Sequence, residues 1–152
     1  MKIAGIKPTS LHDGIGVNFV IFFQGCLHGC KGCQNPGTWD CEKGYEISAA
    51  DIIGEIKKYL DMITGVTFSG GEPMLQSDAV YELAKTCKEM GLTTTLYTGY
   101  TLDKLHLFRE IPFLDYVVDG QFQENLKGDY PFRGSSNQKM WKKVGKRLFE
   151  EM

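Results

Sequence analysis

The residues best suited to chemistry in this chain are three cysteines within eight positions, Cys26, Cys30 and Cys33, spaced C-x3-C-x2-C. Gly29 and Gly32 lie between them. Because each interior glycine costs a helix about 1 kcal/mol, we expect a loop that wraps closely around a compact cluster. Iron–sulfur clusters usually take four thiolate ligands, so three thiolates would leave one iron open to a reactant.

A zinc site is the alternative, with His28 or Cys41 as the fourth ligand. It is disfavoured because zinc knuckles rarely follow a buried strand in an α/β domain. We otherwise expect His28 to be a loop residue, with ligand or substrate contact as the alternative, and Cys41 to be a small, partly buried residue. Cys87 falls on the apolar stripe of a predicted helix, which indicates a core residue.

The composition limits the class of protein. An odd, clustered set of five cysteines without an apolar signal core at the N-terminus indicates metal binding rather than a disulfide framework. The net charge of −2 lacks the basic surplus of nucleic-acid-binding proteins. The longest apolar run, Phe19–Phe23, is far short of the ~20 residues of a membrane-spanning helix. We therefore expect one cytoplasmic domain over residues 1–152, with no nucleic-acid or membrane partner.

Short β-type runs alternate with helical patterns along the chain. The predicted strands are Val17–Phe23, Gly65–Ser69, Thr93–Tyr97 and Tyr116–Val118. One helix is expected after a Ser48 cap, a second after a Ser77 or Asp78 cap with Gly91 at its end, and a short third over Thr101–Phe108. Gln138–Val144 fits an edge strand or a helix, and Lys146–Met152 is expected to be a helical tail.

This alternation predicts an α/β fold with parallel strands and right-handed crossovers. Each predicted strand ends in a polar or glycine-rich segment, and ligands of parallel α/β folds bind at the carboxyl ends of strands. Because a full eight-fold barrel typically needs ~250 residues, we expect a partial, open parallel (β/α) barrel.

The cysteine motif after one strand, followed by the turn Ser69-Gly70-Gly71-Glu72-Pro73 after the next, resembles the radical S-adenosylmethionine (SAM) superfamily. Further strings are similar to the activating enzymes of anaerobic ribonucleoside-triphosphate reductase, over roughly residues 12–144. They are Asp13–Gly16, Gly25–Trp39, Tyr97–Tyr100, Val118–Gly120 and Arg133–Gln138. Three positions depart from common family patterns: Ile15 replaces Pro, Asn18 replaces Arg, and Gly32 replaces an aromatic residue beside the adenine.

The resemblance implies a fold of the radical SAM type and its chemistry. Cys26, Cys30 and Cys33 would hold a [4Fe–4S] cluster, whose open iron is chelated by the amino and carboxylate groups of SAM. An electron from a flavodoxin-like or ferredoxin-like donor would break the S–C5′ bond of SAM. The resulting 5′-deoxyadenosyl radical would abstract hydrogen from a glycine of the partner, anaerobic ribonucleoside-triphosphate reductase.

The resemblance also implies contacts to SAM. Gly70 and Gly71 would let the backbone approach closely, and Glu72 would accept from the methionine ammonium. The alternative for this segment is a plain β-to-α turn. The remaining cofactor-binding positions are Gly32, Cys33 and Gln34 along the adenine, Thr98 and Gly99 near the ribose or carboxylate, and Asp119. For Asp119, contact with SAM, binding of a monovalent cation and capping of a neighbouring segment all stay open.

A barrel too short to close indicates a protein substrate, which would contact Gly120–Gln138. Trp39 and Tyr100 are expected as walls more than as recognition elements. The basic residues of the C-terminal part are expected to form a solvated face, with docking to an acidic partner as the alternative; they are Lys139, Lys142, Lys143, Lys146 and Arg147.

Two other functions compete with this hypothesis. The first is an activase of another glycyl-radical enzyme such as pyruvate formate-lyase, against which the string Arg133–Gln138 argues. The second is a non-catalytic Fe–S or zinc module, against which Glu72 argues because a structural cluster needs no ligand for SAM.

Overall fold

A sheet with a parallel centre organises the fold in the computed structural model, which describes residues 1–33 and 35–152. Within that part of the chain, eight strands form one sheet in the order β10-β9-β6-β5-β4-β2-β1-β3. The parallel centre consists of β2 (Asn18–Phe23), β4 (Gly65–Gly70), β5 (Thr93–Tyr97) and β6 (Tyr116–Asp119). These are the four strands predicted from the sequence, with three of their eight ends shifted by one residue.

Antiparallel strands extend the sheet on both sides. β1 (Lys2–Ser10) pairs with β2 and with β3 (Tyr45–Glu46), while β9 (Lys139–Lys143) pairs with β6 and with β10 (Phe149–Glu151). In the described residues the outermost strands β3 and β10 do not pair with each other, so the sheet does not close. The expected α/β partial, open barrel is confirmed.

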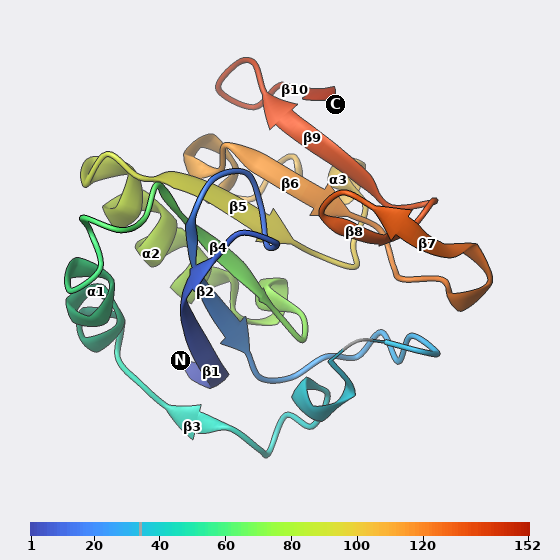
Figure 1. Ribbon diagram of the computed structural model, residues 1–152, viewed down its shortest axis with the longest axis horizontal. Coiled ribbons are helices and arrows are strands. Elements are labelled where there is room, and N and C mark those ends of the chain that lie inside the picture. The colour runs from blue at the N-terminus through green and yellow to red at the C-terminus, as the bar shows by residue number, and fades with distance from the viewer. Residues whose placement is uncertain (34) are drawn as a thin grey trace.

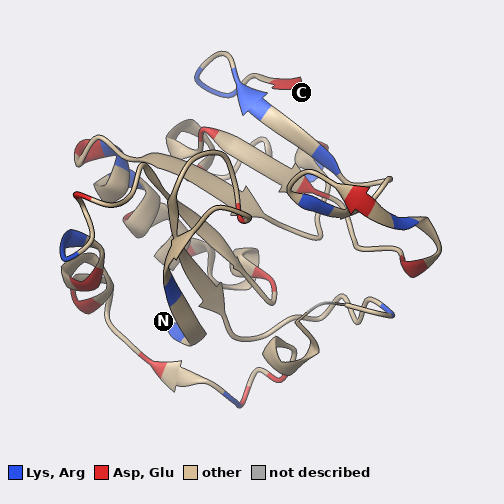
Figure 2. Cartoon of the chain, viewed as in Figure 1, with Lys and Arg blue, Asp and Glu red and all other residues tan. Residues whose placement is uncertain are grey.

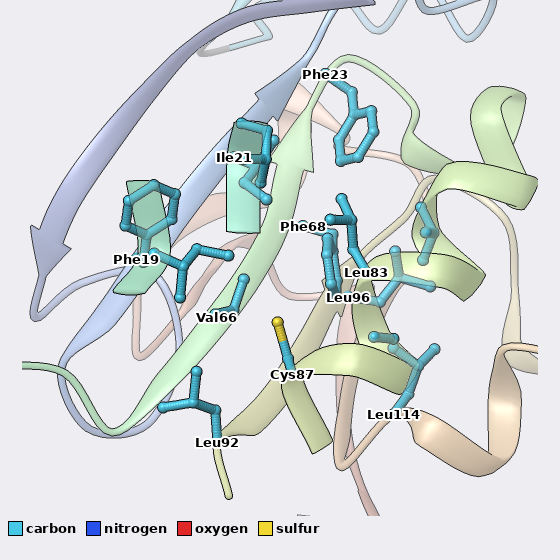
Figure 3. Close-up of a cluster of buried hydrophobic side chains, with 14 of the residues drawn as sticks. Phe19, Ile21, Phe23, Val66, Phe68, Leu83, Cys87, Leu92, Leu96 and Leu114 are labelled. Atoms are coloured by element: carbon cyan, nitrogen blue, oxygen red, sulfur yellow. The ribbon is translucent and has the colours of Figure 1, made fainter. Parts of the chain in front are cut away.

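The two faces of the central strands differ in polarity. Phe19, Ile21 and Phe23 of β2 point into a fully buried cluster, which Phe68 of β4 and Leu96 of β5 also join (Figure 3). Because side chains alternate along a strand, the residues between them face the inside of the partial barrel. On β2 that face carries the apolar Val20 and Phe22 beside Asn18, whereas on β4 and β5 it carries the buried polar side chains of Thr67, Ser69 and Thr95. The apolar face packs the fold, and the polar face is left to line a site.

Helices α1 (Ala49–Lys57) and α2 (Ser77–Glu89) cover the apolar face, and α3 (Leu102–Leu105) connects β5 to β6 (Figure 1). Ser48 caps α1 as predicted, accepting from the backbone N–H of Asp51 at 3.1 Å. For α2 the predicted cap is wrong. A 3₁₀ turn over Pro73–Gln76 leads directly into the helix, so Gln76 takes the cap position and the Ser77 hydroxyl donates to Glu110 instead.

The C-terminal residues form strands rather than the predicted helical tail. β9 settles the open assignment of Gln138–Val144, and β10 occupies Phe149–Glu151. The register Phe149↔Lys143 and Glu151↔Trp141 satisfies the β10 backbone, and Phe149 packs against the core. Pairing with a strand already in the sheet therefore overrides the local helical pattern. The third helix is also shorter than predicted, ending at Leu105.

Cys87 lies in the core on α2, as predicted (Figure 3). Burial raises the pKa of its thiol from 9.0 to about 12. We expect iodoacetamide at pH 8 to leave Cys87 unlabelled in the native protein and to label it after unfolding in urea, because the thiolate is the nucleophile. Peptide mass spectrometry measures both, with the exposed Cys41 as the internal control; native labelling of Cys87 at the unfolded rate would contradict its burial.

None of the helices in residues 1–33 and 35–152 combines the length and hydropathy needed to cross a bilayer.

Candidate active site

A cavity of about 710 Å³ opens at the carboxyl ends of the parallel strands. We call it the edge cavity. One side of the cavity is formed by the cysteine loop, by the end of β4 with the residue after it, and by the end of β5 with the two residues after it; these are Cys26, His28, Cys30, Cys33, Ser69, Gly70, Gly71, Tyr97, Thr98 and Gly99. The remaining walls come from Leu11–Asp13, Gly120–Phe122, Asp129–Gly134 and Gln138. Three of the sequence motifs that could do chemistry thus meet in one place.

The strand register explains this convergence. Phe23 of β2 lies beside Gly70 of β4, and Phe68 of β4 lies beside Leu96 of β5. The three strands therefore end at the same level, and the segments that follow them emerge side by side. Gly71 packs tightly against the backbone of Gly25 and of Thr38. A side chain at this position would collide with both of their carbonyl groups. This position admits only glycine.

The cysteine segment forms a loop, as predicted. Gly29 and Gly32 adopt positive φ angles of 61° and 75°, in the left-handed region that favours glycine. The loop is fixed at its start by the Cys26 N–H, which donates to the Trp39 carbonyl at 3.1 Å, and it turns where the Cys33 N–H donates to the Cys30 carbonyl at 3.2 Å. All three cysteines are partly exposed toward the edge cavity.

Backbone N–H groups lie close to the sulfur atoms. The Asn35 N–H donates to Cys33 Sγ at 3.3 Å. Burial raises the pKa of the Cys26 and Cys30 thiols, and the nearby Glu72 carboxylate adds to this, while hydrogen bonds from the backbone of His28 and of Phe122 lower it. The Cys26 and Cys30 thiols are therefore harder to ionise than a free thiol, and binding of a metal group as thiolates must release their protons.

The donor set fits an iron–sulfur cluster. Three thiols share one cavity, and backbone N–H groups are placed to stabilise sulfur charge. Among residues 1–33 and 35–152, no three His, Cys, Asp or Glu side chains converge closely enough for a single metal ion. Cys41 is exposed and Cys87 lies in the core, so neither lines the edge cavity in the described structure.

The Glu72 carboxylate accepts hydrogen bonds from several groups of the site. It is 1% exposed. Its Oε1 accepts from Gly99 N–H at 2.7 Å and from the Thr98 hydroxyl at 3.0 Å, and Oε2 accepts from Met74 N–H at 3.0 Å and Thr98 at 2.9 Å. His28 Nε2 lies 2.7 Å from Oε1 as a fourth donor. The acceptor assigned from the sequence to the SAM ammonium is thus filled by protein donors.

His28 is a site residue that the sequence prediction underrated. Its side chain is only 10% exposed, and Nδ1 lies 3.0 Å from Nε2 of Gln121. The imidazole packs edge-on against Tyr100, with ring centroids 4.9 Å apart. A Cβ on Gly99 would come within 2.5 Å of His28 Nε2, so the glycine at the end of β5 makes room for this ring. The only sequence signal was its place between two cysteines.

The other predicted SAM-binding positions divide into three groups. Gly70, Gly71, Thr98 and Gly99 line the edge cavity together with Cys33. Gly32 instead turns toward Glu124, whose carboxyl carbon would lie 3.0 Å from a Cβ at this position. Gln34 lies outside the described residues.

Asp119 does not face the edge cavity. Its Oδ2 accepts from the Leu102 N–H at 2.8 Å, and its Oδ1 accepts from Trp141 Nε1 at 3.0 Å. It borders a second, separate hollow formed by α3, β9 and β10. Of the three roles left open, this geometry matches capping of a neighbouring segment, here the first turn of α3, and Asp119 is not among the described residues that line the edge cavity.

The segment Arg133–Gln138 contains the second strand of a hairpin that lines the edge cavity. Strands β7 (Lys127–Tyr130) and β8 (Arg133–Ser135) form it, and Gln138 Oε1 accepts from the N–H groups of Gly134 and Ser135 at 2.9 and 3.1 Å. Gln138 Nε2 donates to the Gly120 carbonyl at 3.0 Å. At the tip, Phe132 has a positive φ of 62°, a conformation costly for a residue with a side chain.

The aromatic and basic residues are placed as follows. Trp39 lines the edge cavity, while Tyr100 packs against His28 and the core. Figure 2 shows the basic residues on β9 and the following turn. The expected solvated face is only partly correct, because Lys143 donates to the Pro112 carbonyl and Arg147 donates to two carbonyls of the α3 segment.

Comparison with known proteins points to one family. A family model described as a 4Fe-4S single cluster domain matches residues 12–141. The anaerobic ribonucleoside-triphosphate reductase-activating protein of Enterobacteria phage T4 is 30% identical over 147 residues, covering 93% of this chain and 94% of the phage protein.

One further relative and one solved structure match over part of their length. The pyruvate formate-lyase 1-activating enzyme of Escherichia coli (strain K12) is 35% identical over 139 residues, 84% of this chain and 56% of that enzyme. The crystal structure of QueE from Escherichia coli superposes with a TM-score of 0.52 at 20% identity, covering 66% of this chain and 53% of QueE. The chain therefore spans little more than half of these two proteins, and the QueE match supports the fold alone.

Proposed function

Because this chain belongs to the radical SAM activating enzymes of glycyl-radical enzymes, we propose that its substrate is anaerobic ribonucleoside-triphosphate reductase. The choice among activases is supported by the match to the phage T4 protein, which runs through nearly the whole of both chains. The observation that carries the proposal is the meeting of three thiols and the Gly70–Gly71 turn in one cavity.

The cysteine loop would hold a [4Fe–4S] cluster through Cys26, Cys30 and Cys33. Once reduced, the cluster supplies the electron that breaks the S–C5′ bond of SAM. The backbone N–H groups near the sulfurs stabilise the thiolate form, and the partial burial of the loop limits access of water. With three protein ligands, one iron of the cluster would have no protein ligand, and SAM would bind to it in the edge cavity that the three cysteines line.

The turn after β4 would orient the amino-acid part of SAM. Gly70 and Gly71 present backbone without side chains to the edge cavity, and Thr98 and Gly99 fix the Glu72 carboxylate by hydrogen bonds of 2.7–3.0 Å. Cys33, with the backbone of Gly32, is proposed to lie along the adenine.

The partner would approach from the open side of the sheet. The β7–β8 hairpin and positions 120–122 form the outer wall of the edge cavity, which makes Gly120–Gln138 the proposed contact region. A glycine-bearing loop brings its own walls, so the chain needs no closed pocket for a small substrate. A flavodoxin-like or ferredoxin-like protein is the proposed electron donor.

Replacing Glu72 by alanine is expected to weaken SAM binding while the cluster still assembles. Loss of a hydrogen bond to a charged group costs ~1.5–3 kcal/mol, which is about tenfold or more in affinity. Anaerobic calorimetry on the cluster-loaded protein without reductant measures the change, and iron content checks the cluster. Glu150→Ala, an exposed glutamate on β10, is the matched control. Unchanged SAM affinity in Glu72→Ala would remove Glu72 from the site.

The proposed function is tested by anaerobic reconstitution with iron and sulfide, followed by SAM and dithionite. The expected product is 5′-deoxyadenosine, quantified by chromatography, with none formed when dithionite or SAM is omitted. A cluster that forms but yields no 5′-deoxyadenosine would favour the non-catalytic Fe–S module.

A further inference from the structure

The Glu72 carboxylate has no accepting position left for a ligand. Four donors meet its two oxygens: the backbone N–H groups of Met74 and Gly99, the Thr98 hydroxyl and the His28 ring. A carboxylate offers about four lone-pair positions, so these donors use its capacity. An ammonium group that contacts Glu72 must therefore displace one of them.

Only one of the four donors is free to leave. Two are backbone N–H groups of the turn after β4 and of the segment after β5, and the Thr98 oxygen is held by the Tyr100 N–H at 3.1 Å. His28 comes from the cysteine loop, is followed by Gly29 in the left-handed region, and lines the edge cavity. A ligand entering from that cavity meets His28 first.

The His28 ring gives Glu72 one hydrogen bond. A carboxylate only accepts, so the proton between them belongs to Nε2. The other ring nitrogen, Nδ1, lies 3.0 Å from the Gln121 amide. An ammonium carries three donors on one small group, so a ligand that bears one can replace the bond that the ring gives up.

We propose that His28 is an internal substitute for the ammonium group of SAM on Glu72, and that SAM binds by exchanging with it. The exchange rests on the proposed function, since it requires that SAM binds here. His28 keeps the buried carboxylate satisfied when SAM is absent, which avoids an unpaired charge in the site. It also lowers the affinity for any ligand that uses Glu72, so it selects for ligands with an ammonium group.

The test measures ligand affinity on the cluster-loaded full chain without reductant, so that no cleavage occurs. The probes are SAM, S-adenosylhomocysteine and 5′-methylthioadenosine, which lacks the amino-acid part. In His28→Ala, SAM and S-adenosylhomocysteine are expected to bind about tenfold tighter, a factor equal to ~1.4 kcal/mol. The affinity for 5′-methylthioadenosine is expected to stay the same.

Gln121→Ala provides a second variant away from the cysteine loop. It removes the hydrogen-bond partner of His28 Nδ1 and loosens the ring without touching Glu72, so a smaller gain in SAM affinity is expected. Iron content and thermal unfolding show that each variant is loaded and folded. If His28→Ala does not load its cluster, Gln121→Ala alone decides by the same criterion.

Weaker or unchanged SAM affinity in both variants would overturn the exchange, because His28 would then support Glu72 or play no part in binding. An equal change for all three probes would also overturn it, since the ammonium would not be involved. A wild-type protein that binds neither SAM nor S-adenosylhomocysteine would instead overturn the proposed function, and the exchange with it.

Discussion

Replacing Cys26, Cys30 or Cys33 by alanine is expected to abolish SAM cleavage. Each of the three thiols lines the edge cavity, and two thiolates cannot hold a four-iron cluster in place with one iron still open. The expected result is loss of about four irons per chain and no 5′-deoxyadenosine above background after reduction with dithionite. Iron analysis and product chromatography on anaerobically reconstituted protein provide the measurement.

Cys41→Ala and Cys87→Ala are the matched controls, and both are expected to retain the cluster. Cys41 is exposed beside the loop, and Cys87 lies in the core between α2 and the sheet. Loss of the cluster in Cys41→Ala would show a closed four-thiolate site and would remove the open iron on which the proposed function depends.

Replacing Arg133 by alanine is expected to remove most of the glycyl radical formed on the reductase while SAM cleavage without the partner continues. Arg133 lies at the end of the hairpin that walls the edge cavity, far along the chain from the cysteine loop. Its Nη1 donates to the Gln138 carbonyl at 3.2 Å, while its buried Nε has no partner within the described residues. The guanidinium lies over the Tyr130 ring, 5.0 Å from its centroid, and both residues line the edge cavity where the partner is proposed to enter.

The measurement compares radical yield by EPR with 5′-deoxyadenosine formed in the absence of the reductase. Arg133→Lys tests whether a positive charge at this position is sufficient for radical transfer. Lys142→Ala, at an exposed basic position on β9, tests whether the basic residues of β9 dock the partner instead. Full radical yield in Arg133→Ala with loss in Lys142→Ala would move the docking region to the basic residues of β9.

The central strands and the cysteine loop were predictable because their signals are local. Runs such as Phe19–Phe23 and Gly65–Ser69 are apolar or β-branched and end at glycine, so they specify buried strands. β1 and β10 were not predicted, since each is fixed by antiparallel pairing with its neighbour along the chain, β2 or β9, rather than by its own pattern.

The site residues also divide into those that local sequence patterns predict and those that depend on contacts between separate segments. The motifs place Cys33 and Gly71 in the edge cavity and Glu72 behind it in contact with His28, because parallel strands put their carboxyl ends together. Asp119 instead accepts a hydrogen bond from Trp141. This contact depends on the pairing of β6 with β9, a strand near the C-terminus. The contact of His28 with Glu72 joins residues 44 positions apart, which no spacing rule in the sequence contains.

The open sheet agrees with a protein as substrate. β3 and β10 stay apart in the described part of the chain, and the edge cavity is walled on its outer side by a two-stranded hairpin. The strained backbone of Phe132 sits at the tip of that hairpin. Strain of this kind persists where surrounding structure enforces it and clusters at sites of contact with ligands.

The most direct test of the account is the EPR spectrum of anaerobic ribonucleoside-triphosphate reductase after incubation with the reconstituted protein, SAM and reductant. A glycyl doublet is expected, and it requires all four components. A doublet that forms with pyruvate formate-lyase but not with this reductase would contradict the assignment and identify the chain as an activase of that other enzyme.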